Sequence, residues 1–256
     1  MSKKYVLLCD YGLDDACATL LLLDSRNASD QVDILPIGGN SEVNVAYRNA
    51  HTLLANYDGD LTNVRIVDTR NEKQPFVKLV HVHGEDGMGD VLAPKQAPVP
   101  VLTYAEWITQ DDQPIILVSL GPCTMTKDIL AKRKVEMLLV MGGCVAQQPN
   151  YNGYEFNHAL DVEAFNESVK FNNTFVATLD SCRTPRFNYA GKKFDESKLL
   201  GKMLNRTIAL ATLRHEDRCY VYDYVAVTYL LKPDTFTVTK SIDPSGNLIN
   251  ELKSKF

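Results

Sequence analysis

Residues 5–23 read YVLLCDYGLDDACATLLLL, and this stretch decides the fold. The apolar run at 5–9 is short, as expected for a buried β-strand. After a short turn around Gly12, residues 14–23 are so apolar that they predict a helix buried on most of its sides. A buried strand followed at once by a buried helix is the first half of a β-α-β unit.

The same alternation of strand and helix continues along the chain. Short apolar runs predict further strands at 32–38, 64–67, 115–118, 137–141 and 175–179. Helical patterns lie at 43–57, 125–133, 161–170, 198–214 and 222–231. We therefore expect an α/β fold, an open, mostly parallel, Rossmann-like sheet with helices on both faces. In such a sheet the ligand site lies at the carboxyl ends of the strands.

The composition is that of one ordinary globular domain, which we expect to span residues 1–256. The 256 residues are 45% hydrophobic, enough to bury a sizeable core without disulfide or metal cross-links. The 27 Lys and Arg residues are outnumbered by 32 Asp and Glu residues, which gives a formal net charge of −5. Nucleic-acid and anionic-membrane surfaces need clustered positive charge, so we expect neither partner and favour a small neutral or cationic one.

The six cysteines are scattered, with none in a CxxC pair, as expected for buried thiols in a reducing compartment. The apolar run before Asp10 is too short for a secretory signal. Nowhere in the sequence is there an apolar run long enough to cross a bilayer. We therefore expect a cytoplasmic protein.

Three carboxylates, Asp10, Asp14 and Asp15, follow the first predicted strand within six positions. One interpretation is capping, because carboxylates in the first turn of a helix satisfy free N–H groups. The other is a metal site, since three acidic groups on one loop repel each other unless a cation or protons neutralise them. Oxygen-only ligands suit a hard ion such as Ca²⁺ or Mg²⁺. The spacing alone leaves both interpretations open.

Other expected strand and helix ends carry further candidates. Asp223, at the expected helix start just ahead of the apolar residues 224–231, is either a plain N-cap or a fourth carboxylate of the same site. Glycines close several strands, at 38–39, 121 and 142–143, and permit either a tight turn or close approach of a ligand. The long polar stretch 68–100 is expected to be functional, its segment HVHGEDGMGD being either a soft-metal site or a solvated loop. Residues 155–157, EFN, lie in a polar loop that is a candidate lid.

Taken in order, these segments resemble the nucleoside hydrolase family, calcium-dependent enzymes that cleave the N-glycosidic bond of ribonucleosides. The family signature DxDPGxDDA appears as LCDYGLDDA at 8–16. Its later blocks follow as GGN at 38–40, HGEDG at 83–87, LGP at 120–122, MGG at 141–143, EFN at 155–157 and a last acidic residue at 223. The ordered set is far more specific than any single block.

The resemblance implies a role for each matching residue. Ca²⁺ would be held by the carboxylates of Asp10, Asp15 and Asp223 and by the backbone carbonyl of Leu120. Asp10 would act as the general base on a Ca²⁺-bound water, and hydrolysis would yield free base and ribose for nucleoside salvage. Tyr222 stands where many members carry a His that protonates the departing base, so we assign it to catalysis. The implied substrate-binding residues are Asp14, Asn40, His83, Met141, Glu155, Asn157 and Asp223.

Three departures from the family pattern support an alternative. Leu8 replaces the first Asp of the signature, Pro149 stands where an Asn that contacts the 5′-hydroxyl is expected, and Tyr222 replaces the His. The alternative is a catalytically impaired, calcium-dependent ribose- or nucleoside-binding protein of the same fold. A Mg²⁺-dependent phosphoryl transferase is disfavoured, because residues 10–14 lack the Asp-x-Asp-x-Thr nucleophile loop. The expected partner is a small-molecule nucleoside, and we expect a homo-oligomer, either a dimer or a tetramer.

Overall fold

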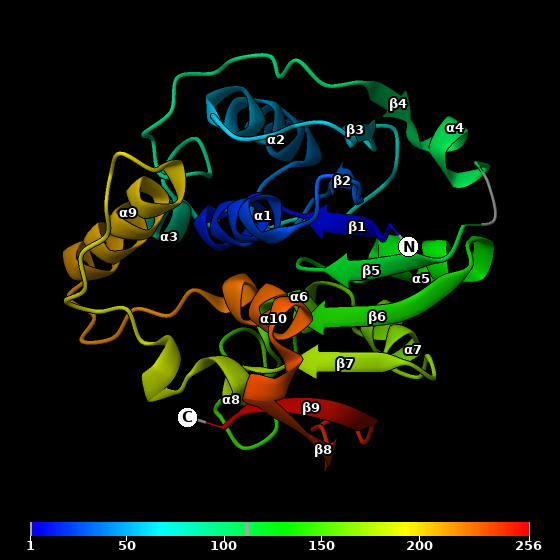
Figure 1. Cartoon of the computed structure of the whole chain (residues 1–256). Helices are drawn as coiled ribbons and strands as arrows, with labels where there is room; N and C mark the ends of the chain where they lie inside the picture. The colour runs from blue at the N-terminus through cyan, green and yellow to red at the C-terminus, as the bar shows by residue number, and fades with distance from the viewer. Residues whose placement is uncertain (1, 111–112, 256) are drawn as a thin grey trace.

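The computed structural model describes residues 2–110 and 113–255, whose strands form one twisted sheet (Figure 1). Its strands are β1 (Lys4–Cys9), β2 (Gln31–Pro36), β3 (Val64–Asp68), β4 (Val101–Thr103), β5 (Ile115–Ser119), β6 (Val135–Met141), β7 (Thr174–Ala177), β8 (Phe236–Ile242) and β9 (Leu248–Ser254). Their order across the sheet is β4-β3-β2-β1-β5-β6-β7-β9-β8. Every neighbouring pair is parallel except β8 and β9. The prediction of an open, mostly parallel sheet is confirmed.

Helices cover both faces of the sheet. They are α1 (Leu13–Ser25), α2 (Val43–Asn56), α3 (Val80–His83), α4 (Tyr104–Ile108), α5 (Thr124–Lys132), α6 (Phe156–Leu160), α7 (Val162–Ser168), α8 (Leu179–Cys182), α9 (Leu199–Leu213) and α10 (Tyr222–Leu231), with 3₁₀ turns η1 (Pro185–Phe187) and η2 (Pro233–Thr235). Side chains alternate along β1, so that Leu7 joins the core under α1, α2, α9 and α10, whereas Leu8 joins the core under α4, α5 and α7. Two apolar layers therefore sandwich the sheet.

The structure corrects two of the expected elements. The strand expected at 175–179 ends at Ala177, and the helix expected at 161–170 is shorter and follows a separate helix, α6. Within the polar loop that is a candidate lid, residues 155–157 form the start of α6, and the Glu155 and Asn157 side chains are buried. Tyr222 and Asp223 form the first turn of α10, at the helix start that the sequence predicts.

The six cysteines are free and buried, as expected. Across 2–110 and 113–255, the helices lack the combination of length and apolar composition that spanning a bilayer requires.

Candidate active site

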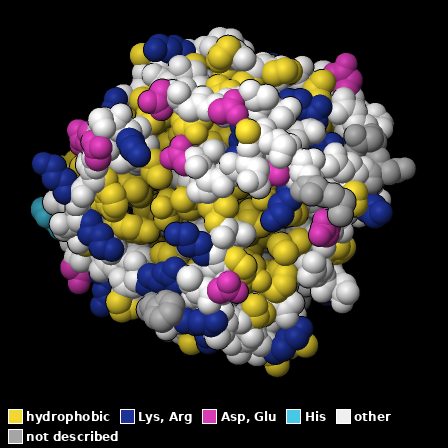
Figure 2. All heavy atoms as spheres, in the orientation of Figure 1, with side chains coloured by type: hydrophobic (Ala, Val, Ile, Leu, Met, Phe, Trp, Pro, Cys, Tyr) yellow, Lys and Arg dark blue, Asp and Glu magenta, His cyan; other side chains and the backbone are white. Residues whose placement is uncertain are grey.

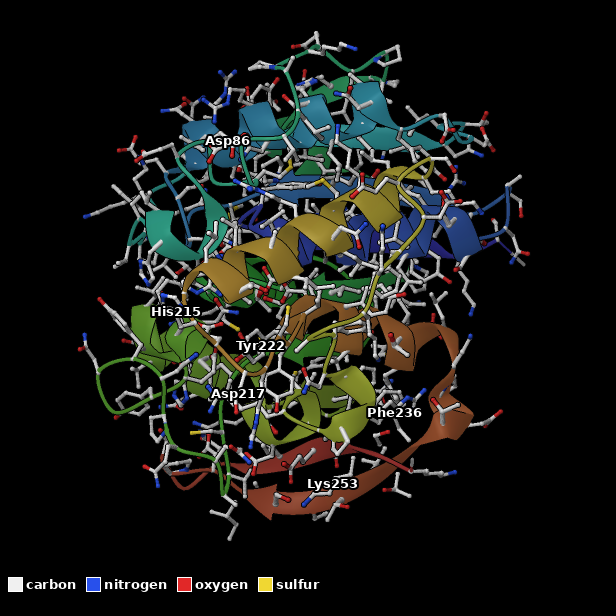
Figure 3. All side chains as sticks on the ribbon, turned by 90° about the vertical axis from the view of Figure 1, so that its left-hand side faces the viewer. Asp86, His215, Asp217, Tyr222, Phe236 and Lys253 are labelled. Carbon is white, nitrogen blue, oxygen red and sulfur yellow. The ribbon has the colours of Figure 1, made fainter. Side chains whose placement is uncertain are left out.

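A cavity of about 390 Å³ opens where the parallel strands end. Its lining residues include Asp14 after β1, Asn40 after β2, Leu120 after β5, Met141 at the end of β6 and Leu179 after β7. The strand arrows of Figure 1 point toward this side, and Figure 3, which looks onto it, shows Tyr222 near the centre. The space-filling view shows apolar side chains exposed in a hollow beside α9, with Lys and Arg along its edge (Figure 2). The cavity therefore lies at the edge of the sheet where the sequence predicts a ligand site.

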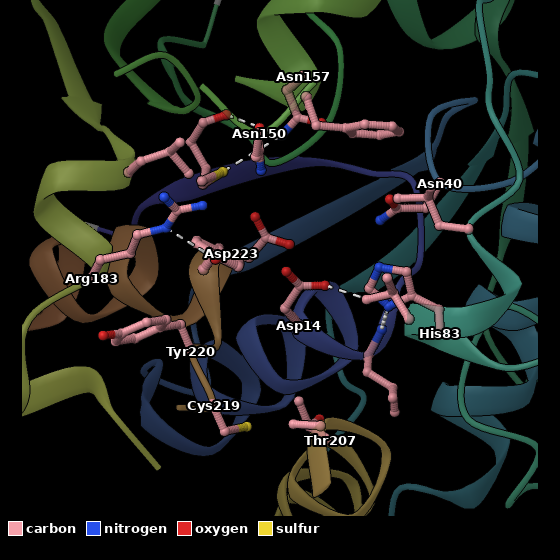
Figure 4. A pocket seen from close by; sticks show the side chains of 18 of the residues that line it. Asp14, Asn40, His83, Asn150, Asn157, Arg183, Thr207, Cys219, Tyr220 and Asp223 are labelled. Atoms are coloured by element: carbon pink, nitrogen blue, oxygen red, sulfur yellow. Dashed lines mark hydrogen bonds and ion pairs between the residues drawn. The ribbon is translucent and has the colours of Figure 1, made fainter. Parts of the chain in front are cut away.

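The two apolar helices α1 and α10 place an acidic cluster at this cavity. Asp14 and Asp15 lie in the first turn of α1, and Asp223 lies in the first turn of α10. One ligand oxygen from each of the three lies within 4.8 Å of the others. The carboxyl groups of Asp14 and Asp223 face the same space in Figure 4. The sequence's two acidic segments, more than half the chain apart, are therefore brought together by helix packing.

Two oxygens of this cluster have no partner in the described part of the chain. Oδ1 of Asp14 and Oδ1 of Asp15 are buried without a hydrogen bond. The second oxygen of Asp15 accepts from the backbone N–H of Gly12 at 2.9 Å. His83 does not neutralise Asp14 at 4.0 Å, because its Nδ1 accepts from the N–H of Leu13 and burial lowers the pKa of the ring. Buried carboxylate oxygens without a hydrogen-bond donor fit a hard divalent cation.

Asp10 lies beside the cluster rather than within it. It is 1% exposed, and Asn40 holds both of its oxygens, through the backbone N–H at 2.7 Å and through Nδ2 at 3.0 Å. Burial raises the pKa of Asp10 to about 6. Burial also raises the pKa of Asp15, with Asp223 as the next cause, and that of Asp223, with Asp14 as the next cause. Burial and mutual repulsion therefore disfavour the free carboxylates, and either protonation or a bound cation relieves the repulsion.

Glu155 and Asn157 complete the floor of the cavity from α6. Asn157 donates through Nδ2 to the backbone carbonyl of Leu120 at 2.8 Å and more weakly to that of Met141 at 3.2 Å. Glu155 accepts from the N–H groups of Gly143 and His158, both at 3.0 Å, while burial raises its pKa to about 7. The structure thus brings the predicted substrate-binding residues to one cavity, with Asp10 and Asp15 buried next to it.

Sequence reasoning missed several residues of the cavity wall. Arg183, at the end of α8, donates through Nε to the hydroxyl of Tyr222 at 3.4 Å. Other lining residues that no motif indicated are Thr207, Ala211, Arg214, Glu216 and Arg218. Arg183 follows a parallel strand by a few residues, so the rule that sites gather at strand ends could have indicated it. Thr207 and Ala211 lie within α9, away from any strand end, so this rule does not indicate them.

Leu8 and Tyr11, which stand where the signature DxDPGxDDA has Asp and Pro, have structural consequences. Leu8 is fully buried in the core on the side of α5, so its side chain is part of the apolar packing. Tyr11 has a φ of +50°, which the ring of the family's Pro cannot adopt because it fixes φ near −65°. The turn before α1 therefore has a backbone conformation that excludes the family's residue.

Known proteins are similar to this chain over most of its length. Residues 5–249 match the family model described as inosine-uridine preferring nucleoside hydrolase. The inosine-uridine preferring nucleoside hydrolase of Crithidia fasciculata is 28% identical over 282 aligned positions, which cover 97% of this chain and 86% of that protein. The pyrimidine-specific ribonucleoside hydrolase RihA of Shewanella baltica strain OS185 is 29% identical, over 64% of this chain and 54% of that protein.

A solved structure shares the fold. The purine-preferring ribonucleoside hydrolase from Gardnerella vaginalis superposes with a TM-score of 0.68 at 21% identity. The superposition covers 99% of this chain and 88% of that one. The whole described sheet, with its helices, therefore belongs to a known architecture.

Proposed function

This chain belongs to the inosine-uridine preferring nucleoside hydrolase family, enzymes that hydrolyse the N-glycosidic bond of ribonucleosides to base and ribose, and we propose that its acidic cavity carries out that reaction. The observation that carries the proposal is the cluster of Asp14, Asp15 and Asp223 at the cavity, with Asp10 buried beside it. Cleavage of a nucleoside proceeds through a sugar cation, and carboxylates around the sugar stabilise that positive charge.

The ion we propose is Ca²⁺, held by Asp10, Asp15, Asp223 and the backbone carbonyl of Leu120. The unpartnered oxygen of Asp15 and the purely oxygen-based donor set support a hard cation at this position. When bound, such an ion supplies positive charge that neutralises the carboxylates and lowers the pKa of water.

The chain's own residues would act as the base, bind the ribose and assist departure of the nucleobase. Asp10 takes the proton from the attacking water, and its two bonds from Asn40 fix the orientation of the carboxylate. Asp14, Asn40, Glu155 and Asn157, with His83, Met141 and Asp223, hold the ribose. Tyr222 donates a hydrogen bond to the departing base, since burial raises the pKa of the phenol and keeps it protonated.

The cellular setting is also a proposal. Six free, buried cysteines support a reducing compartment, so we place the enzyme in cytoplasmic nucleoside salvage. Exposed apolar side chains on the edge hairpin β8–β9, namely Val238, Ile242 and Leu248, support a homo-oligomer, a dimer or a tetramer.

The substitution Asp10→Asn tests the assignment of the base. With calcium present, we expect release of base from inosine or uridine to fall by about 10²- to 10⁴-fold while the melting temperature changes little. Asp58→Asn, on an exposed loop, is the matched control for the same change of charge. Retained hydrolysis in Asp10→Asn would reject Asp10 as the base. Calcium-dependent binding of nucleosides by the unmodified protein, with no release of base, would support the impaired-binder alternative.

A further inference from the structure

Arg183 presents a guanidinium to the cavity in which the carboxylates lie (Figure 4). Its Nε donates to the hydroxyl of Tyr222 at 3.4 Å, and its Nη1 donates to the backbone carbonyl of Gln148 at 3.3 Å. Both partners are neutral. Within 2–110 and 113–255 no carboxylate lies within ion-pair distance of Arg183, and Asp180 of the same helix accepts instead from the backbone N–H groups of 145–147. The positive charge of Arg183 is therefore left facing the cavity.

Arg214 lines the same cavity as Arg183, but a carboxylate neutralises its charge. Its Nε and Nη2 donate to the two carboxylate oxygens of Glu216, each at 2.9 Å. A bidentate pair of this kind satisfies the charge of the guanidinium. Of these two arginines, Arg183 is the one with charge available to a ligand.

Cleavage of a neutral nucleoside separates charge. The C1′–N bond breaks with its electron pair going to the base nitrogen, so the sugar becomes cationic and the base anionic. The carboxylates match the first charge, and a fixed cation on the opposite side of the bond would match the second. Tyr222 alone is a poor acid, since an unperturbed phenol has a pKa of about 10.

We propose that Arg183 is a catalytic residue that stabilises the departing base as an anion. Its guanidinium faces the base directly, and its N–H on the oxygen of Tyr222 turns the phenolic O–H toward the base. The hydroxyl of water adds to C1′ and its proton goes to Asp10, which returns it to solvent. The released base takes a proton from solvent, so one water is consumed and nothing is oxidised. This inference rests on the proposed function, because the base must depart beside Tyr222.

The test compares two substrates with the same sugar and different leaving groups. Para-nitrophenol leaves readily as an anion, so a para-nitrophenyl riboside needs little help, whereas uridine and inosine need much. We expect Arg183→Met to lower kcat for the nucleosides by about 10²-fold and to leave kcat for the aryl riboside nearly unchanged. Arg183→Lys, which keeps the charge but not the planar fork, should recover part of the loss.

Arg186→Met is the matched control, three positions along. Its guanidinium binds Thr235 and Ser254 and does not line the cavity. The control should leave the ratio of the two rates unchanged, and melting temperatures of all variants report folding. Equal losses on both substrates, or no loss on nucleosides, would overturn the role of Arg183 while leaving the proposed function intact. An unmodified protein that releases no base from any nucleoside would overturn both.

Discussion

The carboxylate of Asp10 occupies its position only because the neighbouring residue 39 is a glycine and has no side chain. Gly39 follows β2 and lies against Asp10, and a Cβ built on Gly39 would overlap the carboxylate and come within 2.7 Å of Cβ of Asp10. We expect Gly39→Ala to displace this carboxylate and to lower kcat for uridine by about 10²-fold, because misplacing a reacting group by about 1 Å has that effect. Steady-state kinetics with calcium present measure the loss.

A second glycine provides the control for this substitution. A Cβ on Gly59 would meet the far end of the Tyr57 side chain, which is hydrogen-bonded to Asp24 and does not line the cavity. Gly59→Ala should therefore leave kcat unchanged. If Gly39→Ala keeps full activity, the carboxylate of Asp10 is either free to move without cost or not the base.

At the scale of elements, Asp33 joins β2 to β3 and α4. This fully buried carboxylate accepts from Nε and Nη2 of Arg65 at 2.7 and 2.8 Å and from Nε1 of Trp107 at 2.7 Å. Asp33→Ala leaves these donors without their acceptor, so we expect the free energy of unfolding to fall by about 3 kcal/mol. Urea denaturation measures the loss, and kcat per folded molecule should not change.

Asp60→Ala is the surface comparison for this element. Asp60 is 52% exposed and lies 3.8 Å from Arg26, so its loss should lower the free energy of unfolding far less than the loss of Asp33. A similar cost for both substitutions would mean that the Asp33 network does not hold β2, β3 and α4 together.

The elements that the sequence predicted well are those whose signal is local. The strand at 5–9 and the helix after it were recognisable because an unbroken apolar run is buried wherever it lies. The hairpin β8–β9 was missed, since β8 is mostly exposed and β9 pairs with β7, as Val176 does with Glu251, across a long sequence separation. Glu155 was expected on a polar loop, but backbone N–H groups at Gly143 and His158 make its burial possible. Such donors become visible only after folding.

On the scale of the whole molecule, the acidic residues behind the net charge of −5 are unevenly placed. Asp10, Asp15 and Asp223 are buried at one cavity, in a fold whose other charged groups are mostly at the surface. Burial raises the pKa of Asp10 to about 6 and raises the pKa of Asp15 and Asp223 as well. An unfolded carboxyl group titrates near pH 4. As the pH rises above about 4, the unfolded chain therefore releases protons before the metal-free fold does.

Because folding raises these pKa values, the metal-free protein becomes less stable as the pH rises. For Asp10 alone the loss between about pH 4 and pH 6 is on the order of 3 kcal/mol, and a bound divalent cation removes the cause by neutralising the carboxylates. We expect calcium in excess over a chelator to raise the melting temperature by about 5 °C or more at pH 8 and by much less at pH 5. Thermal melts in calcium, in magnesium and in chelator at both pH values measure this rise in melting temperature. The Asp15→Asn variant should lose most of the rise. Equal melting temperatures with calcium and with chelator at pH 8 would contradict a cation site, and a larger gain with magnesium would replace calcium as its ion.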